Sequence, residues 1–324
     1  MTSLNDEQLV QYGERSRGKV VLITGAAAGI GKETALVFAQ FEAKLVLGDL
    51  NGAGIDEVVA QIKKSGGQAV GQKCDVTNWD SQLALFELGI STFGAIDVVV
   101  ANAGITENGV FYSSQVVDGK PQKPSTATLD VNINGVIYSI SLALHYLDLN
   151  RASPSDLKAI VVMGSMASWM SIPTAPMYSA SKHAVLGFAR SVAVTVKSRN
   201  IRVNVIHPFF SATGILNTVN RLFLAGLPMV PVHRIAITTL YAATHPDLET
   251  TGSVFTLIDD GPILHLENEI IKGGVYDIVS NRAAQLSGTI TYLRVGVDVA
   301  KILAPKVLKV AVPVGLAALA YSFT

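Results

Sequence analysis

Short apolar runs rich in β-branched residues alternate along the chain with longer segments whose apolar residues recur every three or four positions. The runs have strand length and are apolar throughout, which is typical of strands buried on both faces of a sheet. The longer segments have the spacing of amphipathic helices. Strands are predicted at 19–24, 44–48, 68–73, 96–101, 159–163, 202–206 and 253–258, and helices after Gly31 and at 53–64, 79–93, 125–147 and 176–198.

Strands that alternate with helices predict βαβ units and an α/β fold: a doubly wound (Rossmann) seven-stranded parallel sheet with helices on both faces. Right-handed crossovers place ligands outside the carboxyl ends of the strands. One such domain is predicted over residues 15–265, with a substrate loop at 209–250. A polar N-terminal segment, 1–14, precedes it, and an apolar C-terminal extension, 266–324, follows it.

The composition excludes several classes of protein. Hydrophobic residues make up 49% and charged residues 15% of the chain, so a disordered chain is excluded. The 25 basic and 25 acidic residues balance, and without a basic cluster we expect no nucleic-acid binding. Cys74 is the single cysteine and the histidines lack metal-ligand spacing, so we expect neither a disulfide nor a metal. The polar N-terminus lacks the order of a secretory signal, which predicts a cytoplasmic protein.

A glycine-rich loop, 24–31, joins the first predicted strand to the first helix. Its glycines allow a tight turn and let the backbone approach a pyrophosphate at the helix N-terminus, where N–H groups favour an anion. Asp49 ends the second strand, where a carboxylate can accept hydrogen bonds from both ribose hydroxyls and would repel a 2′-phosphate. No Lys or Arg occupies residue 28 or residues 50–52. The sequence therefore favours NAD over NADP.

Ser165, Tyr178 and Lys182 follow the fifth predicted strand. Tyr178 and Lys182 are four residues apart on a helix and so share a face. An ammonium beside the phenol, helped by a positive nicotinamide ring, would lower the pKa of Tyr178 from its usual value near ~10. Tyr178 could then act as the acid/base in oxidation of an alcohol, with Ser165 holding the oxygen.

These features together resemble the short-chain dehydrogenase/reductase family over most of residues 15–265. Asp75-Val76 is similar to the family's adenine-contacting pair, and Asn102 to Gly104 is similar to its Asn-Ala-Gly segment. Asn132 lies where the family has a fourth catalytic residue, which holds a water that connects Lys182 to solvent. The resemblance implies a homodimer or homotetramer. It also implies cofactor contacts from Gly25, Gly29, Ile30, Gly31, Asp49, Asp75, Val76, Asn102, Ala103, Gly104, Tyr178, Lys182, Pro208, Ser211 and Thr213.

Within the family, residues 176–188 and 258–266 are most similar to NAD-linked 15-hydroxyprostaglandin dehydrogenases. One departure is Phe209, which follows Pro208 where the family usually has Gly. Loss of that Gly removes a residue that lets the chain pass close to the nicotinamide, so we expect Phe209 to narrow the site or to shift the cofactor.

Apolar side chains predominate where the substrate pocket is expected, which suits a lipophilic secondary alcohol such as a terpenoid, a steroid or an oxygenated fatty acid. The predicted function is NAD-dependent oxidation of such an alcohol. Reduction of a ketone in the reverse direction and a non-catalytic NAD-binding scaffold are the alternatives. The predicted wall is formed by Phe111, Tyr112, Met166, Trp169, Met170, Phe209, Phe210, Ile215, Leu216, Leu222, Phe223, Leu224, Leu227 and Met229.

The end of the chain, residues 290–324, combines apolar residues with three lysines and is interrupted by Pro305 and Pro313. Its last uncharged stretch is short for a membrane-spanning helix. Two interpretations stay open. The segment packs in an oligomer interface or over the substrate pocket, or it contacts a membrane surface with its lysines at the headgroups.

Overall fold

The computed structural model describes residues 1–107, 116–149, 153, 155–172, 175–211 and 226–267, together with Leu293. The chain divides into two units, Met1–Ile271 and Lys272–Thr324. The first unit holds every element described below. The extension predicted from residue 266 onward lies almost entirely outside the described residues.

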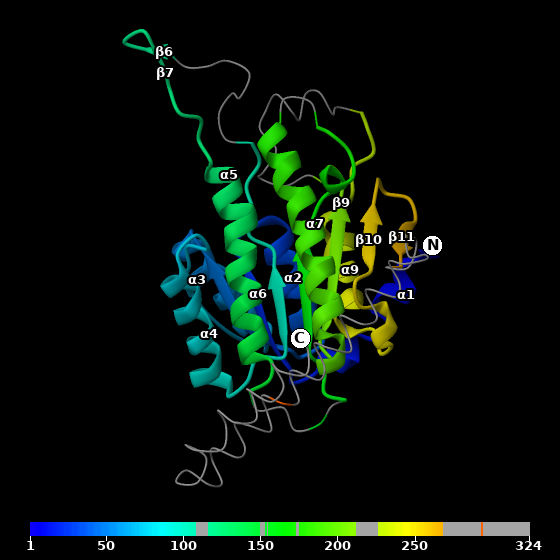
Figure 1. Ribbon diagram of the computed structural model, residues 1–324. Coiled ribbons are helices and arrows are strands. Elements are labelled where there is room, and N and C mark those ends of the chain that lie inside the picture. The colour runs from blue at the N-terminus through cyan, green and yellow to red at the C-terminus, as the bar shows by residue number, and fades with distance from the viewer. Residues whose placement is uncertain are drawn as a thin grey trace, which may run out of the picture. The chain divides into compact units, whose positions relative to one another are not determined.

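Within the described residues, seven parallel strands lie side by side in a nine-stranded sheet, from β10 to the edge strand β4 (Figure 1). Their order across the sheet is β10-β9-β8-β5-β2-β3-β4, so the direction of winding reverses between β2 and β5. The predicted doubly wound parallel sheet is confirmed, and the carboxyl ends of β2 and β5 mark the edge where ligands bind in such folds. The strands are β2 (Val20–Thr24), β3 (Lys44–Asp49), β4 (Gln68–Lys73), β5 (Val98–Ala101), β8 (Ala159–Met163), β9 (Arg202–Pro208) and β10 (Val254–Leu257).

Two antiparallel strands extend the sheet beyond the seven predicted ones. β11 (Ile263–Leu266) pairs with β10, and β1 (Thr2–Leu4) pairs with β11. The helix α1 (Asp6–Val10) follows β1 and is capped by Asn5. Segments this short carry too little hydrophobic pattern to be recognised, and their partners lie at the other end of the domain. The expected polar segment 1–14 is therefore part of the sheet edge.

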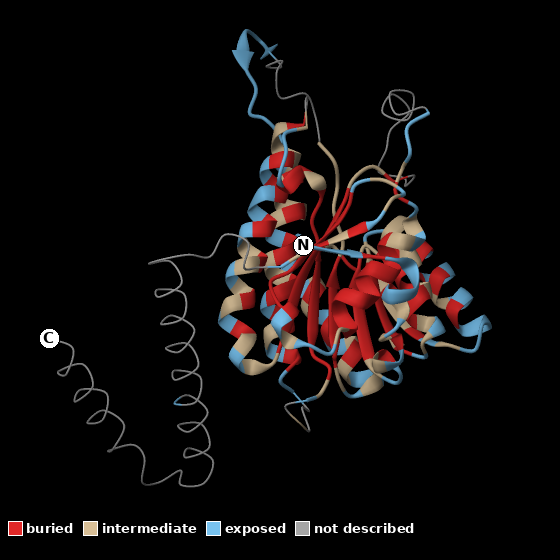
Figure 2. Cartoon of the chain, turned by 90° about the vertical axis from the view of Figure 1, so that its right-hand side faces the viewer, coloured by how far each residue is buried: buried red, intermediate tan, exposed pale blue. Residues whose placement is uncertain are grey.

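Helices cover both faces of the sheet (Figures 1 and 2). Each face has its own buried apolar cluster, one beneath each group of helices. One face carries α2 (Gly29–Gln40), α3 (Gly52–Lys64) and α9 (Val232–Thr244), and the other carries α4 (Trp79–Phe93), α6 (Gly135–Tyr146) and α7 (Pro176–Val196). A small hairpin of β6 (Val116–Val117) and β7 (Lys120–Pro121) projects from the carboxyl edge.

The helix α9 was not predicted, because the range 209–250 was expected to be a substrate loop. Every residue from Ile235 to Thr244 is buried, so the helix has no polar face that would reveal its period. The hydroxyl groups of its threonines donate hydrogen bonds to carbonyl oxygens four residues earlier in the helix. Thr239 Oγ1, for example, donates to the carbonyl oxygen of Ile235 at 2.8 Å. The range 209–250 thus contains a core helix that packs against α2.

The predicted helix at 125–147 is built from three pieces. α5 (Ala127–Leu129) leads through a π-helical turn, Asp130–Asn134, into α6. The whole stretch is long and apolar enough to cross a membrane, but 44% of its most apolar window is buried inside the protein. Because it packs on the sheet and carries a polar residue used below, we interpret it as a core helix.

A buried ion pair fastens the amino ends of three neighbouring strands. Lys158 Nζ lies 2.9 Å from Asp97 Oδ1 and donates to the carbonyl oxygen of Ile96 at 3.0 Å. The other carboxylate oxygen of Asp97 accepts from the N–H of Val20 at 2.8 Å. The pair therefore connects β2, β5 and β8 at the edge opposite the predicted site.

Replacing Asp97 by Ala should lower the free energy of unfolding by about 3–5 kcal/mol, because it leaves the ammonium of Lys158 buried without a counter-charge. Guanidinium denaturation of both proteins measures the change. The matched control is Glu249→Ala, which breaks an exposed pair with Lys197 and should cost at most about 1 kcal/mol. Equal losses in the two variants would contradict the role given to the buried pair.

Candidate active site

The glycine-rich loop is packed tightly at the carboxyl ends of β2 and β5. Gly25 and Gly29 have positive φ angles of 69° and 55°, and a Cβ atom on Gly31 would overlap the carbonyl group of Gly25. The helix α2 begins at Gly29, and Ala28 before it provides no side-chain cap. The first N–H groups of this helix, which include that of Ile30, are therefore suited to a phosphate.

Asp49 lies at the end of β3 and is half-buried. Its two oxygens accept hydrogen bonds from the N–H groups of Ala27 at 3.0 Å and of Asn51 at 2.9 Å. Each oxygen has a further lone pair that could accept from a ribose hydroxyl. Lys73 is exposed and lies opposite Asp49 in the register of β3 and β4, a pairing that no pattern in the sequence indicates.

The next predicted cofactor contacts line the same edge. Asp75 is half-buried and accepts from the N–H of Thr77 at 2.9 Å. Val76 is buried, and its carbonyl oxygen accepts from Gln82 Nε2 at 2.6 Å. Leu50, which directly follows Asp49, has a side chain that is 63% exposed. An exposed leucine at a ligand-binding edge is suited to contact with an adenine ring, and the sequence analysis had not singled it out.

Asn102 uses its side chain within the protein. Its Nδ2 donates to the carbonyl oxygens of Thr24 at 2.9 Å and of Gly25 at 3.0 Å. The backbone N–H groups of Asn102 and Ala103 both donate to Thr24 Oγ1 at 3.2 Å. The predicted Asn-Ala-Gly segment thus holds the glycine-rich loop against the end of β5.

Ser165, Tyr178 and Lys182 lie together at the carboxyl edge. Ser165 is buried after β8, near enough to the Tyr178 hydroxyl to act on its pKa through hydrogen bonding. Tyr178 lies in the first turn of α7, and Lys182 Nζ is 5.8 Å from the centre of its ring. Lys182 is buried, and its ammonium donates to the carbonyl oxygen of Met163 at 2.8 Å.

Asn132 belongs to the π-helical turn and is fully buried. Its amide exchanges two hydrogen bonds of 2.9 Å with the backbone of Ile105, and its Nδ2 lies 3.0 Å from Ser181 Oγ. A Cβ on Gly104 would lie 3.2 Å from Asn132 Oδ1 and 3.7 Å from Lys182 Nζ. The structure therefore brings all four predicted catalytic residues to one edge, where Gly104 lies beside Asn132 and Lys182.

The ionisation of these groups is dominated by burial. Burial raises the pKa of Tyr178, although its hydrogen bond with Ser165 acts in the opposite direction. Burial lowers the pKa of Lys182 to about 8. For the protein alone, the direction of the Tyr178 shift is thus opposite to the lowering expected from the sequence, because loss of solvent outweighs the other effects on the phenol.

Glu107 is a contact that the sequence analysis missed. Its Oε2 accepts from the backbone N–H of Tyr178 at 2.8 Å, while Ala175 before α7 provides no side-chain cap. The carboxylate satisfies an N–H group in the first turn of the helix and lies at the positive end of its dipole. No local motif indicates this contact, because the two residues are far apart in the sequence.

The segment after β9 was expected to contact the cofactor through Pro208, Ser211 and Thr213. Pro208 is buried and ends the strand, and Ser211 Oγ donates to the carbonyl oxygen of Val230 at 2.7 Å. Thr213 lies outside the described residues. The Phe209 ring packs against the apolar core beneath α2 and α9, with its centre 4.4 Å from that of Phe210. Part of the Phe209 ring thus packs on the core, and the expectation that Phe209 narrows the site or shifts the cofactor stays a prediction.

The predicted pocket wall is described only in part. Trp169, Met170 and Leu227 have side chains that are 40%, 46% and 57% exposed, and Met166 is half-buried. Seven members of the predicted wall lie outside the described residues: Phe111, Tyr112, Ile215, Leu216, Leu222, Phe223 and Leu224.

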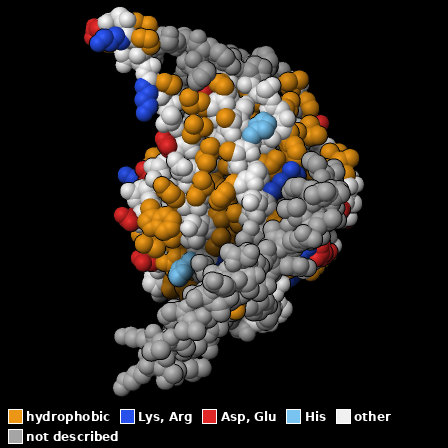
Figure 3. Space-filling view, viewed as in Figure 1, with side chains coloured by type: hydrophobic (Ala, Val, Ile, Leu, Met, Phe, Trp, Pro, Cys, Tyr) orange, Lys and Arg blue, Asp and Glu red, His pale blue; other side chains and the backbone are white. Residues whose placement is uncertain are grey.

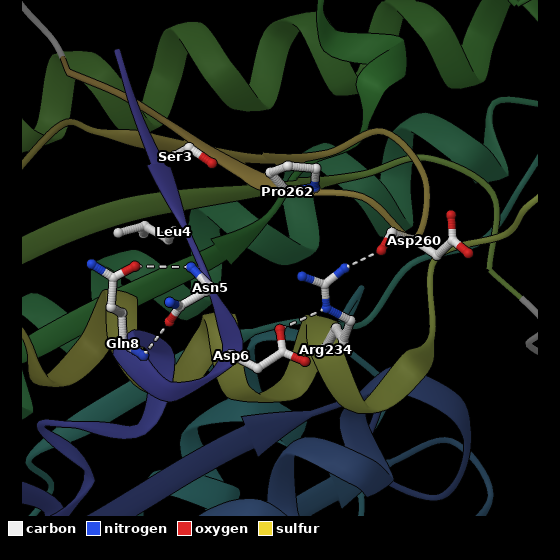
Figure 4. A pocket seen from close by; sticks show the side chains of 8 residues that line it. All are labelled: Ser3, Leu4, Asn5, Asp6, Gln8, Arg234, Asp260 and Pro262. Atoms are coloured by element: carbon white, nitrogen blue, oxygen red, sulfur yellow. Dashed lines mark hydrogen bonds and ion pairs between the residues drawn. The ribbon is translucent and has the colours of Figure 1, made fainter.

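A surface pocket lies elsewhere, beside β1 and the first turn of α9 (Figure 4). Arg234 dominates it, but its guanidinium is already engaged. Nε donates to Asp6 Oδ1 at 2.8 Å, and Nη1 donates to the carbonyl oxygens of Asp260 and Gly261 at 2.7 Å. This pocket contains none of the predicted catalytic residues, and its arginine holds the N-terminal segment against the turn before β11.

Replacing Lys182 by Met should raise stability at pH 7. A fall in the pKa of Lys182 from 10.5 to about 8 on folding means that folding destabilises the charged form of the lysine by about 3 kcal/mol relative to the neutral form. Between pH 8 and 10.5 the unfolded chain binds the additional proton, so the free energy of unfolding of the natural protein should rise with pH. Guanidinium denaturation at pH 7 and 9.5 should show a smaller rise in Lys182→Met.

The control for this comparison is Lys197→Met, which removes an exposed ammonium paired with Glu249. It should keep the pH dependence of the natural protein. If the free energy of unfolding rises equally with pH in Lys182→Met and in the natural protein, burial of the Lys182 ammonium does not destabilise the fold.

Residues 19–222 match the family model described as short chain dehydrogenase. The chain is 33% identical over 254 residues to a 3-oxoacyl-[acyl-carrier-protein] reductase of Synechocystis sp., covering 76% of this chain and 97% of that protein. A 3-ketoacyl-(acyl-carrier-protein) reductase from Brucella melitensis complexed with NADH superposes with a TM-score of 0.66 at 26% identity, covering 76% of this chain and 98% of that one. A short chain dehydrogenase from Burkholderia cenocepacia in complex with NADP gives a TM-score of 0.65 at 25% identity, over 76% and 98%. These similarities do not single out 15-hydroxyprostaglandin dehydrogenases.

Proposed function

Because the chain belongs to the short-chain dehydrogenase family, we propose that it uses NAD to oxidise a secondary alcohol on a lipophilic small molecule to a ketone. The observation that carries the proposal is the convergence of Ser165, Tyr178, Lys182 and Asn132 at the edge where the glycine-rich loop could hold a nucleotide. The bound cofactor would supply the hydride acceptor.

The four side chains divide the work. Tyr178 accepts the proton of the substrate hydroxyl, and Ser165, which lies near the Tyr178 hydroxyl, holds the substrate oxygen beside it. Lys182 stabilises the phenolate and, through its lowered pKa, can itself pass a proton. Asn132 bonds the backbone of Ile105 and the hydroxyl of Ser181, and a relay from Lys182 to solvent would begin beside it.

The preference for NAD rests on Asp49. A carboxylate at the end of β3 accepts from ribose hydroxyls and repels a 2′-phosphate. Lys73, opposite Asp49 on β4, is the feature that favours NADP. We give Asp49 the greater weight because its two backbone hydrogen bonds hold it beside the glycine-rich loop, whereas Lys73 is exposed.

The direction of the reaction is the second question. The Synechocystis relative is a reductase of a 3-oxoacyl group, which favours ketone reduction as the alternative activity. The same four residues serve both directions, since Tyr178 would then donate its proton. A non-catalytic scaffold is disfavoured because the complete set of proton-transfer groups is present. The exposed apolar residues after Ser165 favour a lipophilic substrate.

Formation of NADH, followed at 340 nm with a panel of lipophilic secondary alcohols, tests the function. We expect turnover with NAD and little with NADP. Tyr178→Phe should lower kcat by about 10²- to 10⁴-fold, because it removes the acid/base, while NADH binding is retained. Turnover that persists in Tyr178→Phe would contradict the mechanism. A preference for NADP that is lost in Lys73→Ala would contradict the role of Asp49.

We also propose that the protein is a homodimer or homotetramer assembled through α6 and α7. Apolar side chains gather over these two helices in the space-filling view (Figure 3). Phe188 and Val192 of α7 and Leu144 of α6 are half-buried and pack at the margin of the core cluster on this side of the sheet. Contact of residues 290–324 with a membrane, and a cytoplasmic location, remain proposals from the sequence.

Sedimentation equilibrium tests the assembly. Phe188→Glu places a charge on the proposed interface and should produce monomers, because an unpaired buried charge is costly. Gln61→Glu, an exposed change on α3, is the control and should leave the mass unchanged. A natural protein that sediments as a monomer would overturn the proposal.

A further inference from the structure

A buried imidazole lies beneath the segment that carries Ser165. His207 is at the end of β9 and is fully buried. The indole Nε1–H of Trp169 donates to His207 Nδ1 at 2.5 Å, and the two ring centres are 5.6 Å apart. Trp169 follows Ser165 by one short turn, Met166–Ser168. His207 thus fixes the far end of this turn.

The same imidazole also contacts the chain just before Ser165. A Cβ atom on Gly164 would overlap Cδ2 of His207 and would lie only 2.5 Å from its Nε2. Residue 164 must therefore be a glycine while this ring occupies the space beside it. His207 touches the chain on both sides of Ser165, at Gly164 and at Trp169.

Further contacts fasten the segment to α7. Ser168 Oγ donates to the carbonyl oxygen of Lys182 at 2.8 Å, and the N–H of Ile172 donates to Ser179 Oγ at 3.1 Å. The guanidinium of Arg190 lies 5.0 Å from the centre of the Trp169 ring. Arg190 of α7 therefore contacts the face of the Trp169 ring, and His207 accepts the hydrogen bond of its indole N–H.

The hydrogen bond defines the protonation of His207. Because the indole N–H is a donor only, Nδ1 must carry a lone pair and the ring proton must be on Nε2. Burial lowers the pKa of His207 to about 3, and the positive charges of Lys182, Arg190 and His183 act in the same direction. The ring is therefore neutral at any pH at which an oxidoreductase of this kind would work.

Nε2 of His207 is buried and has no hydrogen-bond partner in the described part of the chain. A buried donor without a partner destabilises a fold. An apolar side chain at residue 207 would avoid this cost, but it could not accept the hydrogen bond of Trp169. The role of the imidazole is therefore better sought in the geometry of the Ser165 segment than in stability.

We propose that His207 is a positioning residue, which sets the Ser165 hydroxyl against Tyr178 by holding Gly164 and Trp169 on either side of it. This inference rests on the proposed function, since it assigns the Ser165 hydroxyl to the substrate oxygen. His207 does not touch the reacting atoms.

Kinetics test the proposal. His207→Leu removes the acceptor and should lower kcat by about 10- to 100-fold, because a small misplacement of a positioning group has effects of this size. NADH affinity should be unchanged. His207→Asn, whose amide oxygen can replace Nδ1 as an acceptor, should recover most of kcat. Trp169→Phe should lower kcat as much as His207→Leu does. The double variant, with His207→Leu and Trp169→Phe, should have a kcat no lower than that of either single variant.

His265→Leu is the matched control. This residue is also a buried histidine, on β11, and its Nε2 lies 2.9 Å from Ser253 Oγ. His265→Leu loses this hydrogen bond and should lower the melting temperature, but it should keep the kcat of the natural protein. Equal kcat values for His207→Leu and His265→Leu, or full activity of Trp169→Phe, would overturn the proposal.

A measurement without turnover separates this inference from the proposed function. The chain has two tryptophans, so a Trp79→Phe background leaves Trp169 as the single emitter. Quenching of Trp169 by acrylamide should increase in His207→Leu and stay unchanged in His265→Leu and His207→Asn. If no alcohol or ketone is turned over, the proposed function fails, but this quenching still tests the contact. Unchanged quenching in His207→Leu would overturn the inference whatever the enzyme does.

Discussion

The close approach of two backbone segments at the carboxyl ends of β2 and β5 is the constraint on which the site depends. Only glycine fits at residues 25 and 31, because a side chain there would collide with the neighbouring backbone. Asn102 locks the approach by donating to Thr24 and Gly25. The uncapped N–H groups at the start of α2 are then available to a phosphate. The same contact places Gly104 next to Asn132 and Lys182. Nucleotide binding and proton transfer are therefore aligned by one packing contact.

The two edges of the sheet use buried charge in opposite ways. At the amino edge, Lys158 is paired with Asp97, so its ammonium is compensated and stabilises the strand ends. At the carboxyl edge, Lys182 is equally buried but is bonded to a carbonyl oxygen, and its pKa falls to about 8. A buried lysine that is paired with a carboxylate contributes to stability alone. An uncompensated one costs stability but can exchange a proton near neutral pH, which is the property that an acid/base site requires.

Sequence patterns predicted the features that depend on neighbouring residues. The parallel strands are continuous apolar runs, and the glycine-rich loop and the Tyr178–Lys182 pair are defined by fixed spacing. The features that were missed depend on partners far along the chain. β1 is a strand because β11 lies beside it, and α9 hides its period because it is buried all round. Glu107 and His207 act through contacts with Tyr178 and Trp169 that no spacing encodes. In the protein alone, burial raises the pKa of Tyr178, and burial is a property that the sequence does not give; the lowering expected with a nicotinamide bound stays a prediction.

The proposed preference for NAD follows from how firmly each charge is held. Asp49 cannot turn away from a bound ribose without losing its hydrogen bonds to Ala27 and Asn51, and the first of these fixes the glycine-rich loop itself. A 2′-phosphate would therefore meet a carboxylate that the fold keeps in place. Lys73 could offset that repulsion only by ordering a long, exposed side chain, which costs conformational entropy. The proposed preference for a cofactor with free ribose hydroxyls thus depends on the same hydrogen bonds that shape the phosphate loop.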